Sequence, residues 1–307
     1  MGAGLDLGEL EGLVGELIVY DQSPQDTVAA RIAGADIVFT NKIRLTRELL
    51  DAAPGLKFIA LTATGTDNID TGCAKQHGIG VANIRHYCTQ SVVEHVFGVL
   101  LALTHSLPRY RDSVRAGDWQ RSTDFCMLHY PVRELSAMTL GIVGYGALGQ
   151  GVARIARAFG MQVIVAARPG TDGVPDGRVG FDELLAGSDV ISLHCPLNEA
   201  TRKLFGAREF RAMKKSAILI NTARGGLVDS QALADALANG EIAAAAIDVL
   251  PQEPPVSGDP LLDYRGDNLV LTPHIAWATD EARQNAIDEL AANTRAFLEG
   301  AERNRVV

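Results

Sequence analysis

Short apolar runs rich in β-branched residues alternate along this chain with stretches whose apolar residues recur every three or four positions. The first pattern is typical of strands and the second of helices. In the N-terminal part, helical patterns at residues 27–33 and 46–52 lie between such runs. Strands that alternate with helices form parallel sheets, because a parallel connection has to cross over the sheet. We therefore predict an α/β domain with strands at residues 17–20, 37–39, 58–61 and 80–82.

A longer helical pattern at residues 92–103 separates this series from a second one. The pattern ends before Pro108, and we predict that this helix is buried and bridges two domains. The second series has six apolar runs with helical patterns between them, which suits a doubly wound nucleotide-binding domain. Its predicted strands are residues 140–143, 163–166, 190–193, 217–220, 244–247 and 269–271.

The last amphipathic pattern, at residues 279–300, predicts a helix that can return to the first domain. We therefore expect one domain made of residues 1–100 and 281–307, and a second made of residues 101–280. The predicted fold class is α/β, with two Rossmann-like or flavodoxin-like domains, parallel sheets and an active-site cleft between the domains.

The charge balance excludes some kinds of partner. The chain has 28 Lys and Arg against 37 Asp and Glu, and its net charge of -9 repels nucleic acid and anionic membranes. No apolar run approaches the roughly 20 residues that span a bilayer. Residues 1–16 carry no basic side chain of the kind that a signal peptide needs. We predict a cytoplasmic protein that binds neither nucleic acid nor membrane.

The cysteines and histidines show no spacing typical of a metal site. Cys73, Cys88, Cys126 and Cys195 are not paired as in zinc sites or redox motifs. We expect reduced thiols and no bound metal.

A glycine-rich loop, GYGALG at residues 144–149, connects a predicted strand to a predicted helix at residues 150–159. In this context the amides at the start of the helix and the helix dipole bind a pyrophosphate. We predict that a dinucleotide contacts Gly144, Gly146, Ala147, Leu148 and Gly149.

The next strand ends without the acidic residue that usually binds the ribose of NAD. Residues 163–166 run instead into a turn that contains Arg168, Pro169 and Gly170. A guanidinium can bind the 2'-phosphate of NADP, and no carboxylate repels it there. We therefore favour NADP(H) over NAD(H). The alternative is that Arg168 is a solvated turn residue and that the protein uses either cofactor.

Four further motifs resemble those of a known family. They are TGTDNID at residues 64–70, NTARGGLVD at 221–229, DVLPQEP at 248–254 and TPHIAW at 272–277. With the glycine loop, and in this order, they resemble the D-isomer-specific 2-hydroxyacid dehydrogenases, above all the glycerate dehydrogenase (hydroxypyruvate reductase) branch. The resemblance covers nearly the whole chain. It implies a substrate domain, residues 1–100 and 281–307, and an NAD(P)-binding Rossmann domain, residues 101–280.

Reduction of a 2-keto acid needs a cation for the carboxylate, a proton donor for the carbonyl oxygen and a hydride for C2. Arg224 and His274 each follow a predicted strand, so both lie at the sheet edge where α/β proteins bind ligands. Imidazole exchanges a proton near neutral pH. The resemblance assigns substrate binding to Arg224, proton donation to His274, and stabilisation of the protonated His274 to Glu253.

The resemblance implies further contacts with substrate and cofactor. Backbone amides at Thr64 and Gly65 would hold the substrate carboxylate, although a plain turn is the alternative. Lys42 and Arg44 either extend this anion site or belong to a solvated face. The residues expected to contact the cofactor, besides the glycine loop and Arg168, are Cys195, Pro196, Thr222, Ala223, Asp248 and Trp277.

The leading functional hypothesis is an NAD(P)H-dependent reductase of hydroxypyruvate or glyoxylate. Two alternatives stay open: a phosphite dehydrogenase that uses the same three residues, and a corepressor-like scaffold that senses the cofactor and binds partner peptides. The resemblance also implies a homodimer, with the helix at residues 92–103 and the following loop packed across the two-fold axis.

The chain departs from the family near its N-terminus. Family members open with a short strand that precedes a segment like residues 5–16, and this chain has no such run there. In a flavodoxin-like sheet that strand is internal, so its loss leaves unpaired edges and a slot. We expect either a start codon assigned too late, or a sheet that is rearranged or has its slot filled by another segment.

Overall fold

The computed structural model describes residue 2, residues 4–168 and residues 173–307. Pro169 and Gly170, which the sequence analysis places in the turn after Arg168, lie outside the described residues. The chain packs as two compact units, Met1–Cys88 with Ala278–Val307 (unit 1) and Thr89–Trp277 (unit 2). Each unit has its own parallel sheet, which confirms the predicted α/β class.

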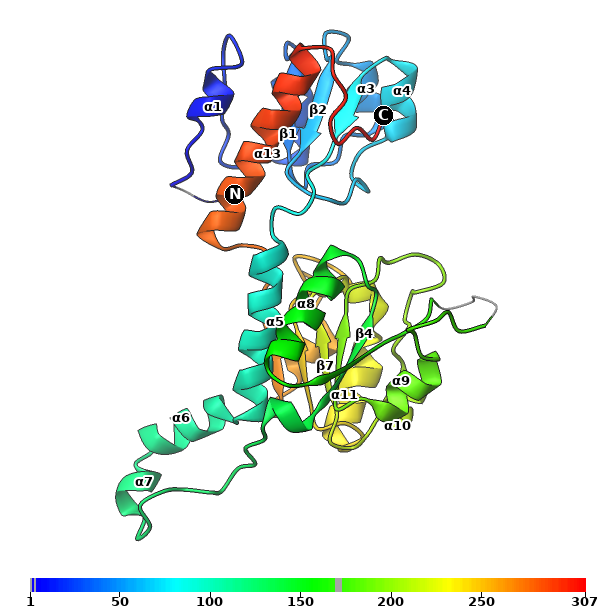
Figure 1. Ribbon diagram of the computed structural model, residues 1–307. Helices are drawn as coiled ribbons and strands as arrows, with labels where there is room; N and C mark the ends of the chain where they lie inside the picture. The colour runs from blue at the N-terminus through cyan, green and yellow to red at the C-terminus, as the bar shows by residue number, and fades with distance from the viewer. Residues whose placement is uncertain (1, 3, 169–172) are drawn as a thin grey trace. The chain divides into compact units, whose positions relative to one another are not determined.

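Unit 1 is built on a three-stranded parallel sheet in the order β1-β2-β3 (Figure 1). The strands are β1 (Ile37–Thr40), β2 (Phe58–Leu61) and β3 (Gly80–Ala82). The long helix α13 (Asp280–Leu298) packs on β2, where the rings of Phe58 and Phe297 stack at 4.4 Å. The C-terminal tail lies beside β3, since Arg305 forms an antiparallel bridge with Ala82. The shorter helices are α1 (Gly8–Glu11), η1 (Gln25–Thr27), α2 (Val28–Ile32), α3 (Arg47–Asp51) and α4 (Thr71–Gln76).

The predicted strand at residues 17–20 does not form, and the prediction is wrong. Among the described residues, residues 16–20 form no backbone hydrogen bond with a neighbouring strand. Ile18 and Val19 are 61% and 62% exposed to solvent. Strand propensity reports how well side chains fit a pleated surface, and it does not supply a pairing partner. Within the described residues, β1 pairs only with β2, and residues 16–20 and β1 line a common cavity.

Unit 2 contains a six-stranded parallel sheet in the order β5-β4-β6-β7-β8-β9. All six predicted strands form, each within one residue of the expected bounds. They are β4 (Thr139–Val143), β5 (Gln162–Val165), β6 (Val190–Leu193), β7 (Ile218–Asn221), β8 (Ala244–Ile247) and β9 (Leu269–Leu271).

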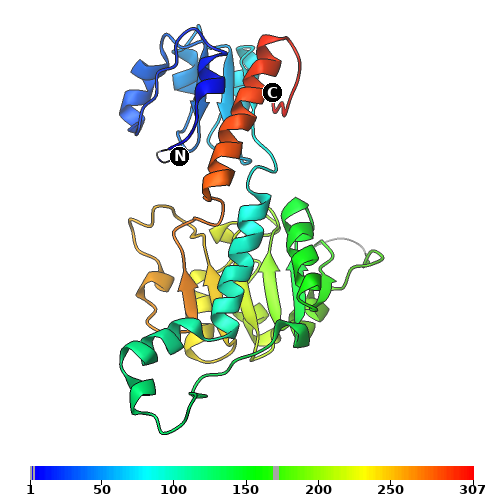
Figure 2. The ribbon, with the colours of Figure 1, turned by 60° about the vertical axis from the view of Figure 1, so that its left-hand side comes forward.

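Helices cover both faces of this sheet and bury a separate core on each. On one face, α5 (Thr89–Thr104) packs against α8 (Ala147–Ala158) and the sheet, as Figure 2 shows. On the other face, helices α9 (Phe181–Gly187), α10 (Ala207–Ala212) and α11 (Ser230–Ala238) contribute Leu184, Phe210 and Leu233 to a second core. The remaining elements are α6 (Leu107–Arg115), α7 (Asp118–Arg121), η2 (Leu135–Ala137), η3 (Gly225–Leu227) and α12 (Pro260–Asp263).

Within the described part of the chain, no single helix is long and apolar enough to cross a membrane. Only α5 and α6 taken together reach the required length and composition, and they are bent by 56°. Most of the apolar side chains of α5 are buried in the core of unit 2, as the sequence predicted for this helix.

Candidate active site

Every candidate residue of unit 2 follows a strand of the same parallel sheet. The glycine loop follows β4, Arg168 follows β5, and Cys195 follows β6. Arg224 follows β7, Glu253 lies in the segment after β8, and His274 follows β9. The carboxyl ends of parallel strands lie at one edge of a sheet, so all these residues gather along that edge. The sheet order also reverses between β4 and β6, which is where doubly wound sheets bind nucleotides.

The glycine loop is shaped by a close approach of two chain segments. Gly144 has φ +95°, and a Cβ atom there would lie 2.5 Å from the backbone nitrogen of Cys195. The amide of His194 donates to the carbonyl oxygen of Val143 at 2.7 Å, which joins the ends of β4 and β6. Helix α8 starts directly after Gly146, and a Cβ atom on Gly146 would meet nothing within 4 Å. The loop therefore presents helix-terminal amides to open space, which fits a pyrophosphate.

Two buried polar atoms at this edge lack a protein partner. Among the described residues, Thr222 Oγ1 and His194 Nδ1 are inaccessible to solvent and make no hydrogen bond. The other ring nitrogen of His194 shares a hydrogen bond of 2.8 Å with Ser192 Oγ. Burial lowers the pKa of His194 to about 4 and raises the pKa of the Cys195 thiol. Unsatisfied buried polar atoms are uncommon in folded proteins. His194 adjoins Gly144 of the glycine loop, and Thr222 follows β7 at the same edge of the sheet.

Asp248 holds the turn that carries His274. Its carboxylate is 3% exposed and accepts hydrogen bonds from Thr272 Oγ1 at 2.6 Å and from the amides of Ile275 and Ala276 at 2.9 Å. Its carbonyl oxygen accepts from the amide of His274 at 2.8 Å. The sequence analysis assigned Asp248 to the cofactor and missed this positioning role, because no local pattern reports hydrogen bonds across 24 or more residues.

His274 and Glu253 form a close pair. Nδ1 of His274 lies 2.6 Å from Oε2 of Glu253, and the amide of Leu250 donates to Oε1 of Glu253 at 2.9 Å. Both side chains remain partly accessible, at 28% for His274 and 33% for Glu253. The backbone of His274 is left-handed, with φ 57°, an uncommon conformation that often occurs at functional sites. Because Nδ1 faces the carboxylate, Nε2 is the ring atom left to meet a substrate.

Arg224 is exposed, and its loop packs on the segment that carries Glu253. The side chain of Asn221 at the end of β7 donates to the carbonyl oxygen of Arg224 at 3.0 Å, which fixes the loop. The next residue is Gly225, where a Cβ atom would lie 2.0 Å from the carbonyl carbon of Leu250. Only glycine allows this contact. The structure therefore brings the loops of Arg224 and Glu253 together.

The structure adds Arg178 to the residues around the glycine loop. A bridge between Ala166 and Val179 returns the chain to the end of β5. The guanidinium carbon of Arg178 then lies 4.8 Å from the ring centroid of Tyr145, inside the glycine loop. Sequence reasoning missed Arg178, because the return of the chain to β5 leaves no periodic pattern.

The candidate substrate residues of unit 1 lie in a loop after β2. Thr64 Oγ1 donates to the carbonyl oxygen of Ile84 at 3.0 Å, and the side chain of Asn83 donates to the carbonyl oxygen of Thr64 at 2.7 Å. Lys42 and Arg44 are exposed. The role of Thr64 and Gly65 in substrate binding stays a prediction.

One cluster of potential metal ligands occurs among the described residues, and none of its members is a candidate site residue. Ligating atoms of Asp51, Cys73 and His77 lie within 4.8 Å of one another in unit 1. His77 Nε2 is 2.7 Å from Asp51 Oδ1, and the Cys73 thiol donates to the same oxygen at 3.6 Å. Hydrogen bonding to one carboxylate therefore accounts for this cluster. The expected absence of a metal stays a prediction.

Comparison with known proteins agrees with this arrangement of parallel sheet, glycine loop and polar edge. Residues 97–276 match the family model "D-isomer specific 2-hydroxyacid dehydrogenase, NAD binding domain". The chain is 46% identical over 282 residues to a glycerate dehydrogenase of Methylorubrum extorquens, covering 92% of this chain and 88% of that protein. It is 39% identical over 308 residues to a hydroxypyruvate reductase of Blautia hydrogenotrophica, covering 98% and 95%.

A solved structure shows the same likeness. The D-lactate dehydrogenase of Aquifex aeolicus, complexed with NAD and lactic acid, superposes with a TM-score of 0.76 at 34% identity, covering 89% of this chain and 85% of that one. The fold and the site thus define an oxidoreductase that uses a nicotinamide cofactor. The chain belongs to the D-isomer specific 2-hydroxyacid dehydrogenases.

Proposed function

We propose that this protein reduces hydroxypyruvate or glyoxylate to D-glycerate or glycolate. The observation that carries the proposal is the pair of His274 and Glu253, 2.6 Å apart, on the sheet edge that also bears Arg224. Two relatives with high identity over nearly their whole length are a glycerate dehydrogenase and a hydroxypyruvate reductase, which supports this substrate class.

In the proposed mechanism Arg224 binds the carboxylate of the keto acid. Its planar guanidinium can donate two parallel hydrogen bonds, which orients the neighbouring carbonyl group. The reduced nicotinamide, when bound, supplies a hydride to C2. His274 donates its Nε2 proton to the carbonyl oxygen, so that one hydride and one proton convert the C2 carbonyl to an alcohol. Glu253 holds the ring through Nδ1 and stabilises the imidazolium that is needed at the start.

We propose that unit 2 binds the cofactor and that unit 1 contributes to substrate binding. The residues that would hold the dinucleotide are those of the glycine loop, with Cys195 and Pro196 after β6 and Thr222 and Ala223 after β7. We infer a preference for NADPH, because Arg168 follows β5 where a carboxylate would select NADH. Arg178, which lies over the ring of Tyr145, adds a second guanidinium near the glycine loop and supports the preference for NADPH.

We further infer that the protein is a homodimer. The region after α5 exposes many large apolar side chains, a feature typical of surfaces that bind another protein. Phe125 is 90% exposed and Leu128 is 82% exposed. In Figures 1 and 2 this region, with α6 and α7, projects from the sheet of unit 2. The other exposed apolar residues in it are Leu107, Val114, Trp119 and Val132.

The test is an absorbance assay at 340 nm, which follows the reduced cofactor. Hydroxypyruvate, glyoxylate, pyruvate and 2-ketoisocaproate are each paired with NADPH or NADH. Phosphite is paired with NADP⁺ or NAD⁺. We expect rapid oxidation of NADPH with hydroxypyruvate or glyoxylate, and kcat/KM for NADPH above that for NADH. In His274→Asn, kcat should fall by about 100-fold to 10,000-fold, because the general acid is lost. His77→Asn replaces an exposed histidine of unit 1 that is not a candidate site residue, and this matched control should keep full activity.

Cofactor binding, followed by fluorescence, shows whether an inactive variant still folds. NADPH binding without turnover of any keto acid would contradict the proposal and favour a scaffold. Turnover of phosphite alone would show that Arg224, Glu253 and His274 serve the oxidation of phosphite.

A further inference from the structure

Helix α5 contacts the turn that carries His274 on both sides of that residue. Oγ of Ser91 in α5 donates to the carbonyl oxygen of Ala276 at 2.7 Å, two residues after His274. Nε2 of His95 lies 3.3 Å from Oγ1 of Thr272, two residues before His274. Ser91 and His95 are four residues apart, so they lie on the same face of the helix. One face of α5 therefore contacts both ends of the turn.

The hydrogen bonds of Thr272 determine which atom is the donor. A threonine hydroxyl has one proton to donate, and an ionised carboxylate only accepts. Thr272 Oγ1 gives its proton to the carboxylate of Asp248 at 2.6 Å, so it accepts from His95. Nε2 of His95 therefore carries a proton, and a chain of donors runs from the ring through the hydroxyl to the carboxylate. Hydrogen bonds linked in this way polarise one another.

The carboxylate at the end of this chain is buried. The side chain of Asp248 is 2% exposed and that of His95 is 16% exposed. Burial of a carboxylate is costly unless donors or a positive charge surround it. Among the described residues, the ring of His95, at 3.9 Å, is the only basic group within 4.0 Å of this carboxylate. His95 is thus both a donor to Thr272 and the nearest group that can carry a positive charge.

Packing alone does not call for a histidine at this position. Val96 follows His95 directly and Val99 lies one turn later, and both are buried in an apolar core of unit 2. An apolar side chain at position 95 would avoid the cost of burying a polar ring. What the histidine adds is its contact with Thr272 and Asp248.

We propose that His95 is a positioning residue for keto-acid reduction, an inference that rests on the proposed function. It holds Thr272 and Asp248 in place. The carboxylate of Asp248 accepts from the amides of the two residues after His274, so a shift of this carboxylate moves the turn. A catalytic group displaced by about 1 Å can lose about 100-fold in rate.

The kinetic test compares three substitutions of His95. Leucine has no donor, asparagine is too short to reach Thr272, and the amide of glutamine places an N–H near the position of Nε2. We expect kcat to fall by about 10-fold to 100-fold in His95→Leu and His95→Asn, and His95→Gln to keep most of it. KM for the keto acid should change little, because Arg224 is untouched. His77→Leu, the same change at an exposed histidine of unit 1, should keep full activity.

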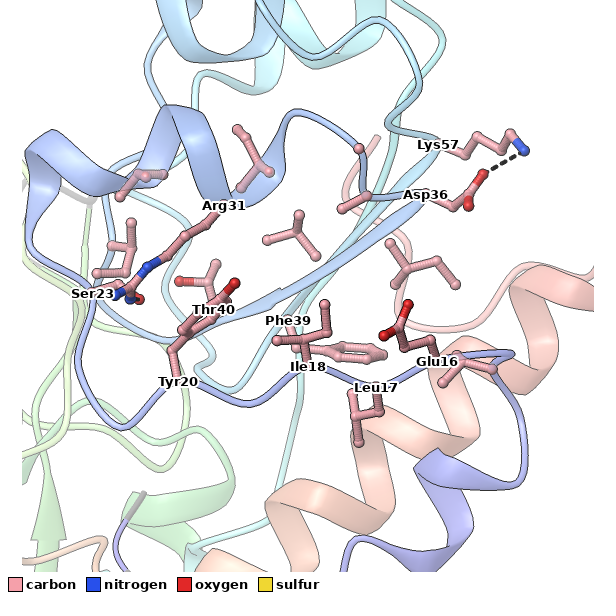
Figure 3. Close-up of a pocket in the computed structure, with 18 of the residues that line it drawn as sticks. Glu16, Leu17, Ile18, Tyr20, Ser23, Arg31, Asp36, Phe39, Thr40 and Lys57 are labelled. Atoms are coloured by element: carbon pink, nitrogen blue, oxygen red, sulfur yellow. Dashed lines mark hydrogen bonds and ion pairs between the residues drawn. The ribbon is translucent and has the colours of Figure 1, made fainter.

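A double-variant cycle tests the path through Thr272. Thr272→Val removes the hydroxyl and keeps the shape of the side chain. In that background His95→Leu should lower kcat no further, because residues of one hydrogen-bond network do not contribute additively. The matched control is Thr40→Val in unit 1, labelled in Figure 3, whose hydroxyl is buried without a hydrogen-bond partner among the described residues. In the Thr40→Val background, His95→Leu should have its full effect.

Hydrogen exchange gives a readout that does not depend on turnover. The amides of Ile275 and Ala276, which Asp248 holds, should exchange faster in His95→Leu and His95→Asn than in the parent protein, and those of β6 should not change. If the parent protein reduces no keto acid, the proposed function fails, and exchange still decides whether His95 holds the turn. Unchanged exchange in both variants would overturn the proposal. So would a kcat equal to that of the parent, an equal loss in all three His95 variants, or losses that multiply in the Thr272→Val background.

Discussion

At the scale of single residues, the proposed chemistry rests on a histidine whose orientation is imposed by its neighbours. Glu253 holds Nδ1 of His274, and Asp248 holds the backbone of the turn. The left-handed φ of His274 is therefore maintained by hydrogen bonds on both sides of the residue. A change in either carboxylate should alter catalysis without removing the ring of the proposed proton donor.

We predict that Glu253→Gln lowers kcat for keto-acid reduction by about 10-fold to 100-fold. The amide can still meet Nδ1, but it no longer stabilises the positive charge on the ring. KM for the keto acid should change little, because Arg224 is untouched. Steady-state kinetics checks this, with Glu241→Gln, a glutamate outside the site, as the control. Unchanged kcat in Glu253→Gln would remove Glu253 from the mechanism.

His194 should make the stability of the protein sensitive to acid. Burial holds its pKa near 4 in the folded protein, whereas an unfolded chain binds the proton near pH 6.5. Protonation therefore favours the unfolded state as pH falls from about 6.5 towards 4. The free energy of unfolding should drop by about 1.4 kcal/mol per pH unit across that window, and this part of the stability is fully present above it.

Urea denaturation at pH 7.5 and at pH 5 measures this effect. His194→Asn should show a smaller loss of stability between the two pH values than the parent protein, by about 2 kcal/mol. An identical loss in the parent protein and in His194→Asn would show that His194 is not the acid-sensitive group.

Sequence reasoning at this scale identified which residues follow strands but not what they contact. Arg224 and His274 lie after β7 and β9, as expected from the apolar runs that precede them. The hydrogen bonds of Asp248 and the packing of Arg178 on Tyr145 depend on how distant segments fold back. No pattern along the chain predicts contacts between segments that are far apart in the sequence.

At the scale of secondary-structure elements, prediction succeeded for the apolar runs that found a neighbouring strand to pair with. The strands of unit 2 were expected within one residue of where they form, because buried parallel strands are continuous apolar runs. The run at residues 17–20 has the same composition and forms no strand. A run of this composition forms a strand only if a neighbouring strand pairs with it, and among the described residues none pairs with this run.

The apolar region after α5 gives a prediction at the same scale. The double variant Phe125→Asp with Leu128→Asp should be monomeric, because charges on this surface prevent its burial against a second copy. Light scattering should give twice the chain mass for the parent protein and one chain mass for the variant. Val256→Asp is the control and should remain dimeric. A parent protein that is already monomeric would contradict the inferred homodimer.

At the scale of the whole molecule, the proposed proton donor, its carboxylate partner, the substrate arginine and the dinucleotide loop all belong to unit 2. They gather along one edge of a six-stranded sheet because every strand in it runs parallel. Unit 1 has its own sheet, its own core and the open edge of β1.

The central claim is that this protein transfers a hydride from a nicotinamide to C2 of a small 2-keto acid and yields the D-isomer. The most direct measurement is the reaction of hydroxypyruvate with NADPH deuterated at C4 of the nicotinamide. Mass spectrometry and chiral chromatography then locate the label and identify the isomer. The account predicts D-glycerate that carries one deuterium at C2. Glycerate without the label, the L-isomer, or no product from a protein that binds NADPH would contradict it.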